Sequence, residues 1–145
     1  MFTGRFEYSI DDKSRVSIPA RFREALSLSG DSRLILTNLD GCIVAYPYPE
    51  WLAIQEKISA NPIQKKARAF VRYFYSGATE CVFDKLGRVL IPQSLKTDAH
   101  IQKNVVIVGM GKKIEVWAKE KWEELVRGAT ADPEEVAEIV AELGL

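Results

Sequence analysis

The chain has 145 residues, of which 47% are hydrophobic and 28% are charged. This composition is typical of a small globular protein and excludes a disordered chain, whose apolar content would not offset the entropy of folding. No apolar run approaches the roughly 20 residues that span a bilayer, so we expect no membrane partner. The N-terminus has no apolar signal core, and Cys42 and Cys81 form no disulfide framework. The sequence therefore predicts a cytoplasmic protein with two small, buried cysteines.

The formal net charge is zero, but the charges are unevenly distributed along the chain. Residues 120–145 contain eight acids and two bases and carry a net charge of −6, whereas residues 1–119 carry +6. A basic body with an acidic tail indicates a polyanionic partner. The alternative is an ordinary solvated helix at the end of the chain.

The chain contains an internal repeat. Residues 4–23 and 77–96, aligned at an offset of 73 without a gap, share seven identities in twenty positions. Both copies read Asp-x-x-x-Arg-Val-x-Ile-Pro, starting at Asp11 and at Asp84. Because two copies are too few for a solenoid, we expect one pseudo-symmetric pair. The predicted units are residues 1–60 and 77–127, with a helical insert at 61–76 and an acidic helix at 128–145.

Each unit is predicted to begin with two short strands that flank a polar turn and form a hairpin. Gly87 supplies the positive φ that such a turn needs, and Ser14 occupies the matching position at some steric cost. The fold class is therefore α+β and β-rich, with a pseudo-twofold pair of hairpins. The predicted strands are 5–10, 15–18, 33–37, 42–46, 79–83, 88–91, 104–108 and 113–117. The predicted helices are 20–26, 61–75 with Pro62 at its first position, 93–99, and three that start near Pro49, Lys119 and Pro133.

Signatures of enzymes are absent from the sequence. The single histidine, His100, lies in a polar stretch, and no residues have the spacing of metal ligands or of a phosphate-binding loop. Asp11 and Asp84 could form an acid–base pair, but each has an arginine four residues later. A structural ion pair that shapes the loop is the favoured interpretation. We therefore expect no catalytic activity, no metal, no cofactor and no small-molecule substrate.

Basic residues cluster around the first turn. Lys13, Arg15, Arg21 and Arg23 lie within eleven residues, and Arg5 precedes them. A two-stranded ribbon fits the major groove of DNA, and arginine can bind guanine through two hydrogen bonds. The alternative is a solvated, charged hairpin. The insert helix adds a basic face that is either solvated or a second phosphate-contacting surface, formed by Lys65, Lys66, Arg68 and Arg72.

These features resemble the MraZ family along essentially the whole chain. The motifs that carry the resemblance are Met1-Phe2-x-Gly4-Arg5-Phe6, the two Asp-x-x-x-Arg sequences, and Tyr73-x-Tyr75-Ser76-Gly77-Ala78. The resemblance implies a tandem pair of AbrB-like swapped-hairpin units and a ring-shaped homo-oligomer, typically an octamer. It also implies a protein of the bacterial cytoplasm and nucleoid that binds double-stranded DNA. The implied role is transcriptional regulation, usually repression, of the division and cell-wall gene cluster, at G-rich direct repeats upstream of its own operon.

The resemblance also assigns roles to residues of this sequence. It implies that Arg15 is the main DNA contact and that Asp11 shapes its loop, with Lys13 and Arg5 as phosphate contacts. Asp84 and Arg88 match the second motif, and Arg21 joins the DNA-binding set through the basic cluster. Ser14 departs from the glycine usual at its position. Two alternatives remain, a protein-binding module of the AbrB-like antitoxin type and a hydrolase that uses the two aspartates.

Overall fold

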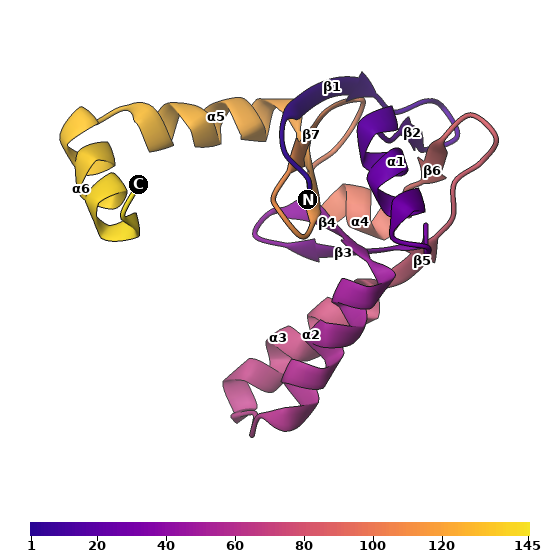
Figure 1. The fold of residues 1–145 in the computed structure, drawn as a ribbon, viewed down its shortest axis with the longest axis horizontal. Coiled ribbons are helices and arrows are strands. Elements are labelled where there is room, and N and C mark those ends of the chain that lie inside the picture. Colours follow the sequence, from indigo (N-terminus) through magenta and orange to yellow (C-terminus); the bar gives the residue numbers. More distant parts are fainter.

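The main sheet of the protein is built by exchange between the two halves of the chain. The computed structural model describes residues 1–145. Its strands are β1 (Arg5–Ser9), β2 (Arg15–Ser17), β3 (Leu34–Leu39), β4 (Cys42–Pro47), β5 (Thr79–Cys81), β6 (Arg88–Leu90), β7 (Asn104–Gly109) and β8 (Ile114–Ala118). Six of them form one antiparallel sheet in the order β1-β7-β8-β4-β3-β5 (Figure 1). The first strand of each half therefore lies against the other half.

The strand order shows the internal symmetry that the repeat predicts. Exchanging each strand for its counterpart in the other half reverses the order and leaves it otherwise unchanged. The pseudo-twofold axis consequently passes between β4 and β8, which pair around Val44 and Glu115. The α+β fold class and the pseudo-symmetric architecture are confirmed.

The predicted local hairpins are wrong in one respect. β1 pairs with β7, and β2 pairs with β6 in a separate two-stranded sheet, so the strands on either side of each loop do not pair with each other. Val16 lies opposite Val89, its counterpart in the repeat, and both are buried. Three-residue strands bury too little surface to be stable alone, and their central valines become buried only when the two halves meet. This exchange is the swapped arrangement that the family resemblance implies.

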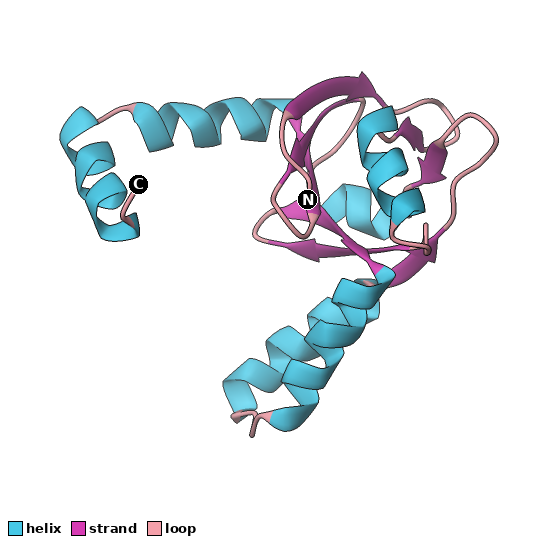
Figure 2. Ribbon diagram, in the orientation of Figure 1, coloured by secondary structure: helices cyan, strands magenta, loops and turns pink.

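The structure contains six helices (Figure 2). They are α1 (Ala20–Leu28), α2 (Tyr48–Ala60), α3 (Lys65–Gly77), α4 (Gln93–Asp98), α5 (Lys119–Thr130) and α6 (Pro133–Leu143). α1 and α4 directly follow Pro19 and Pro92, as the sequence predicts. None of the helices combines the length and the apolar character needed to cross a bilayer.

The insert helix starts later than predicted. α3 begins at Lys65 rather than near Pro62, because α2 extends to Ala60 and the intervening residues reverse the chain. Asn61, at the end of α2, has extended backbone angles. α2 and α3 then lie side by side, with the rings of Trp51 and Phe74 5.5 Å apart. The pair projects from the body as one helical arm, and α5 with α6 forms a second arm (Figure 1).

Apolar side chains cover both faces of the main sheet. The larger cluster fills the space between the sheet, α1, α4 and the β2–β6 pair, and it includes Leu34 and Leu36. Ile35, which points to the opposite face, joins a smaller cluster beneath the α2–α3 arm. This alternation is the period of two expected of a strand. Cys42 and Cys81 are free thiols buried in these clusters, as predicted.

Gly109 fixes the N-terminal segment against β7. A Cβ atom at this position would lie 2.4 Å from the backbone nitrogen of Thr3, and the Gly109 amide donates to the Gly4 carbonyl at 2.9 Å. We expect Gly109→Ala to displace this segment and lower the free energy of unfolding by about 1–3 kcal/mol, as overpacking does. Chemical denaturation measures this change.

The matched control is Gly128→Ala, in the interior of α5. A Cβ atom there meets nothing within 4 Å. The same chemical change should therefore stabilise the protein, by up to about 1 kcal/mol, through helix propensity. Equal denaturation midpoints for the two variants would contradict this account of Gly109.

Candidate nucleic-acid interface

Two loops of the same construction flank the β2–β6 pair. Asp11 Oδ1 accepts hydrogen bonds from the backbone amides of Lys13 (3.0 Å) and Arg15 (2.9 Å), and its Oδ2 accepts from Arg15 Nε at 2.8 Å. Asp84 accepts the equivalent bonds from the amides of Leu86 and Arg88 (both 2.9 Å) and from Arg88 Nε (2.8 Å). The aspartate–arginine pairs predicted from the four-residue spacing are thus present in both loops. Each carboxylate folds its own loop and positions the arginine that follows.

The hydrogen bonds change the acidity of both carboxyl groups. The backbone amide of Arg15 is the largest cause that lowers the pKa of Asp11, and the amide of Arg88 acts in the same way on Asp84. The arginine side chains lower both pKa values further. Both aspartates are therefore held as acceptors, which is unlike the proton-sharing pair that acid–base chemistry needs.

The two arginines differ in what their terminal nitrogens contact. Arg15 uses Nε for Asp11, and neither of its terminal nitrogens donates a hydrogen bond within the chain. Arg88 reaches both carboxylates, because its Nη1 lies 3.6 Å from Asp11 Oδ2. Arg88 therefore connects the two halves of the molecule. Arg15 instead presents a fixed guanidinium group with free donors at the surface.

Ser14 and Gly87 each lie under a basic side chain from the other half of the chain. Both have positive φ angles, 61° and 76°. The guanidinium group of Arg23 covers Gly87 so closely that a Cβ atom there would lie 2.5 Å from its Cζ. Lys96, the counterpart of Arg23 in the repeat, instead donates from Nζ to Ser14 Oγ at 2.9 Å. Serine at position 14 is thus covered by a lysine, whereas glycine at position 87 is covered by an arginine.

Sequence reasoning did not identify this covering role of Arg23 and Lys96. The alignment at an offset of 73 already pairs the two residues, so the repeat contained the signal. The alignment could not show that α1 and α4 each cover the loop of the opposite half, because this arrangement follows from the exchanged strands.

The other predicted DNA-binding residues lie in two places. Lys13 is exposed in the same loop as Arg15. Arg5 begins β1, four residue steps or about 13 Å from the end of the strand that leads into this loop. Arg21 contacts the same N-terminal region, where its Nη2 donates to the Thr3 carbonyl at 2.7 Å. The structure therefore brings Lys13, Arg15 and Arg88 together, and it places Arg5 and Arg21 beside the N-terminal segment.

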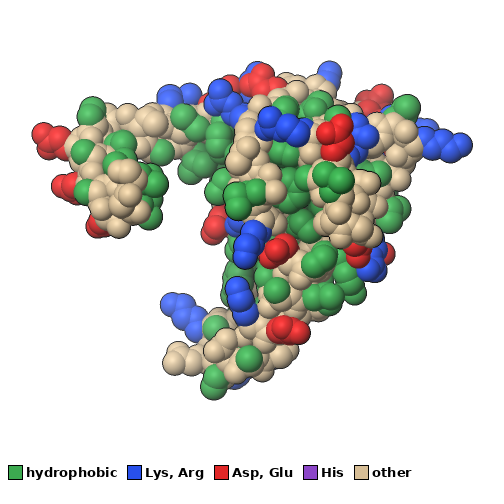
Figure 3. Space-filling model, viewed as in Figure 1, with side chains coloured by type: hydrophobic (Ala, Val, Ile, Leu, Met, Phe, Trp, Pro, Cys, Tyr) green, Lys and Arg blue, Asp and Glu red, His purple; other side chains and the backbone are tan.

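Charged side chains of both signs lie on the body of the molecule (Figure 3). Lysine and arginine side chains project from the end of the body that carries the two loops, whereas acidic side chains lie on the outer side of the C-terminal arm (Figure 3). This arm leaves the body on the side away from β2 and β6 (Figure 1). The acidic tail consequently leaves the basic loops uncovered.

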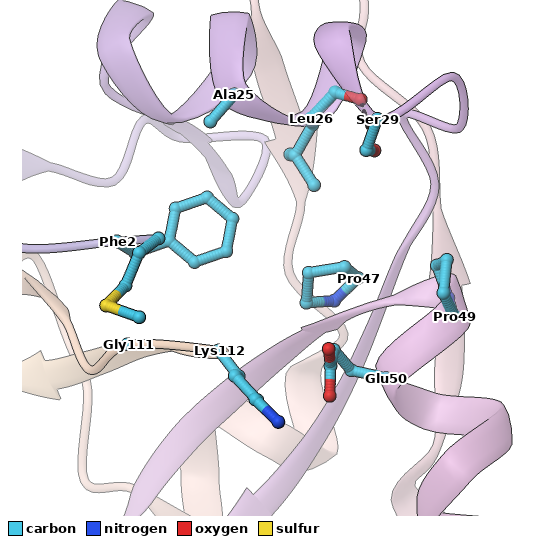
Figure 4. Close-up of a pocket in the computed structure, with 10 residues that line it drawn as sticks. Phe2, Ala25, Leu26, Ser29, Pro47, Pro49, Glu50, Gly111 and Lys112 are labelled. Carbon is cyan, nitrogen blue, oxygen red and sulfur yellow. Dashed lines mark hydrogen bonds between the residues drawn. The ribbon is translucent and has the colours of Figure 1, made fainter.

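A separate cavity of about 290 Å³ opens beside α1 (Figure 4). Phe2 and Leu26 point into it, with Glu50 and Lys112 on its lower side. The hydroxyl of Ser29 donates to the Leu26 carbonyl at 2.6 Å, so it is engaged with the backbone rather than with a base. Histidine and cysteine are both missing from the lining, and no three metal-binding side chains of the chain are grouped to hold an ion.

The loop carboxylates allow a test by titration. Because the pKa values of Asp11 and Asp84 are lowered in the folded state, their charged forms stabilise the loops above the ordinary value of 3.8. This stabilisation should be lost progressively as the pH falls below 3.8 and through the lowered values. Carboxyl-carbon NMR titration of the folded protein checks this expectation, and the same titration in denaturant is the control. A folded-state pKa of 3.8 or higher for Asp11 would contradict the hydrogen-bonding pattern.

Comparison with known proteins identifies the family. The family model described as "MraZ protein, putative antitoxin-like" matches twice, over residues 1–73 and 74–139. The transcriptional regulator MraZ of Pelotomaculum thermopropionicum is 48% identical over 147 residues, which cover 100% of this chain and 99% of that protein. Its namesake in Carboxydothermus hydrogenoformans is 48% identical over 139 residues, 95% of each chain, and that in Clostridium tetani is 45% identical over 146 residues, the whole of both chains.

These relatives are named as transcriptional regulators, a non-enzymatic class of protein, which sets aside the hydrolase hypothesis. The two family matches coincide with the two halves that exchange strands in the structure. The chain therefore belongs to the MraZ family.

Proposed function

We propose that the protein is a transcriptional regulator that binds double-stranded promoter DNA through the loop before β2. The observation that carries this proposal is the guanidinium group of Arg15, which Asp11 holds through Nε while both terminal nitrogens stay free. A guanidinium group fixed in this way can bind O6 and N7 of one guanine together. Because its orientation is already set, little conformational freedom remains to be lost on binding.

The surrounding residues support this contact. Lys13 lies in the same exposed loop and contacts phosphate. Arg5 and Arg21, beside the N-terminal segment, contact phosphates further along the duplex. Asp11 and Asp84 keep the loops in shape, and Arg88 holds the two halves together while it lies close to the DNA.

The internal symmetry of the chain suggests how copies associate. One chain already contains the twofold relation that a swapped-hairpin dimer has, so further association can be head-to-tail and close into a ring. We propose a ring-shaped homo-oligomer, an octamer, of chains that each contain units 1–60 and 77–127, the insert 61–76 and the acidic segment 128–145. Neighbouring copies then present their Arg15 loops in the same orientation. Such a ring binds direct repeats, whereas a simple twofold dimer binds palindromes.

The proposed sites are G-rich direct repeats upstream of the protein's own operon, in the division and cell-wall gene cluster. Binding there represses transcription by occupying the promoter. The protein acts in the cytoplasm, in association with the nucleoid.

Two variants can separate base contacts from phosphate contacts. Arg15→Ala removes a base contact worth roughly 1–3 kcal/mol, so operator affinity should fall while affinity for unrelated DNA changes little. Lys13→Ala should weaken binding to all sequences alike and reduce the slope of log affinity against log salt by about 1. Fluorescence anisotropy with the protein's own upstream DNA and a scrambled duplex, over a salt series, measures both effects.

Arg15→Lys is the matched control, because it keeps the charge of Arg15 but loses the paired donors. It should lose sequence preference and retain salt dependence. The proposal fails if Arg15→Ala has the same melting temperature and oligomeric state as wild type and still binds the operator with wild-type affinity.

The spacing of the DNA repeats provides a test of the ring. Several repeats spaced by about 10 base pairs lie on one face of the duplex, so a ring can bind them together. Each later contact is then intramolecular, and avidity should add about 10²–10⁴-fold to the affinity for one repeat. Moving one repeat by half a helical turn, without changing its sequence, should remove its contribution. An electrophoretic shift in which one repeat binds as tightly as three would contradict the multivalent ring.

A further inference from the structure

The C-terminal arm has no core of its own. α5 and α6 contain no buried residue, although α6 has a clear apolar face. Ile139, Val140 and Leu143 on this face are 46%, 38% and 67% exposed. An isolated helix of this length is marginal in water, and helical stability in proteins comes mainly from packing of an apolar face. α5 is anchored to the body through Trp122, which packs against the smaller core cluster, whereas Ile139, Val140 and Leu143 of α6 remain exposed.

The charge of α6 limits which partner can pack on this exposed face. The helix carries four acids and no base, Glu134, Glu135, Glu138 and Glu142. Its net charge of −4 excludes a nucleic acid and favours a basic surface. Hydrophobic side chains lie on the inner side of the arm and acidic side chains on its outer side (Figure 3). The partner is therefore expected to combine exposed apolar groups with surrounding positive charge.

α3 has this combination. It carries four bases and no acid, Lys65, Lys66, Arg68 and Arg72. All four are exposed, and none forms a salt bridge within the chain. Phe70 and Tyr73 of the same helix are large apolar residues that are 48% and 46% exposed. The charges of α3 and α6, +4 and −4, are equal and opposite.

The two helices also match in length. α6 has 11 residues and α3 has 13, which correspond to about 16 and 20 Å. Within one chain they cannot meet, because the two arms leave the body in different directions and a hollow separates them (Figures 1 and 3). A second copy of the chain can supply the missing helix.

We propose that α6 of one copy packs on α3 of the next, with Ile139, Val140 and Leu143 against Phe70 and Tyr73. This inference rests on the self-association in the proposed function and names the surfaces that make it. Because α6 and α3 are different surfaces, the contact is heterologous and repeats from copy to copy, which closes into a ring when the rotation permits. The DNA-binding loops stay free, since the C-terminal arm lies on the side of the body away from them.

Charge reversal provides a test with an internal rescue. The acid-reversed chain carries Glu135→Lys and Glu142→Lys in α6, and the base-reversed chain carries Lys65→Glu and Lys66→Glu in α3. Each chain alone brings like charges together at every contact and should self-associate at least about tenfold more weakly than wild type. An equal mixture should recover the wild-type assembly, because reversed α6 then meets reversed α3 and wild-type α6 meets wild-type α3 in alternation. Sedimentation velocity at low salt measures the assembly, and circular dichroism verifies the fold.

The apolar part of the contact has its own matched pair. Ile139→Asp places a charge in the centre of the apolar face of α6 and should abolish assembly. Leu145→Asp makes a similar change beyond the end of α6, where the side chain is 86% exposed, and should leave assembly intact.

The outcomes separate this inference from the proposed function. The inference is overturned if wild type is monomeric, if each reversed chain assembles as wild type does, or if the mixture shows no recovery. It is also overturned if the base-reversed chain loses DNA affinity with unchanged assembly, because α3 would then be a phosphate-contacting surface. If assembly follows the pattern above but no chain binds the upstream DNA, the inference stands and the proposed function fails.

Discussion

The pairing of β2 with β6 is the contact on which the rest of the structure depends. It places Val16 against Val89 on the pseudo-twofold axis, and it sets the two loops at opposite ends of one short ribbon. The exchange continues in the main sheet, where Phe6 pairs with Ile107, about a hundred residues away in the sequence. Neither half can complete its sheet or bury its motif strand alone. The two halves are therefore one folding unit, although the sequence repeats.

The same pairing explains how the loops are held in shape while they stay exposed. Backbone amides after each aspartate turn inward to its carboxylate, and the following arginine is held through Nε. Amides that would otherwise donate only to water in an exposed loop thereby have a local acceptor. A basic side chain from the opposite half then covers the residue with positive φ. Both halves therefore contribute contacts to the surface that we propose for DNA.

Much of this could be predicted from the sequence. The repeat indicated two related halves, the four-residue spacing indicated the ion pairs, and alternation of apolar residues located the main strands. Partner choice between strands could not be predicted, because period-two alternation marks a strand without naming its neighbour. The sequence alone therefore predicts that β2 pairs with β1, its nearest strand along the chain. The start of α3 could not be predicted either, since Pro62 is as suitable for a connecting turn as for the first turn of a helix.

Ser14 and Gly87 show what covalent linkage of two similar units permits. In a symmetric dimer of separate chains, every substitution appears twice, so both loops must accept it. Here the serine occurs in one loop only, under Lys96, while the other loop keeps glycine under Arg23. The two ends of the β2–β6 ribbon are therefore chemically distinct, although both keep the same aspartate–arginine loop. A molecule of this kind has a polarity, and it can present one face to a partner that itself runs in one direction.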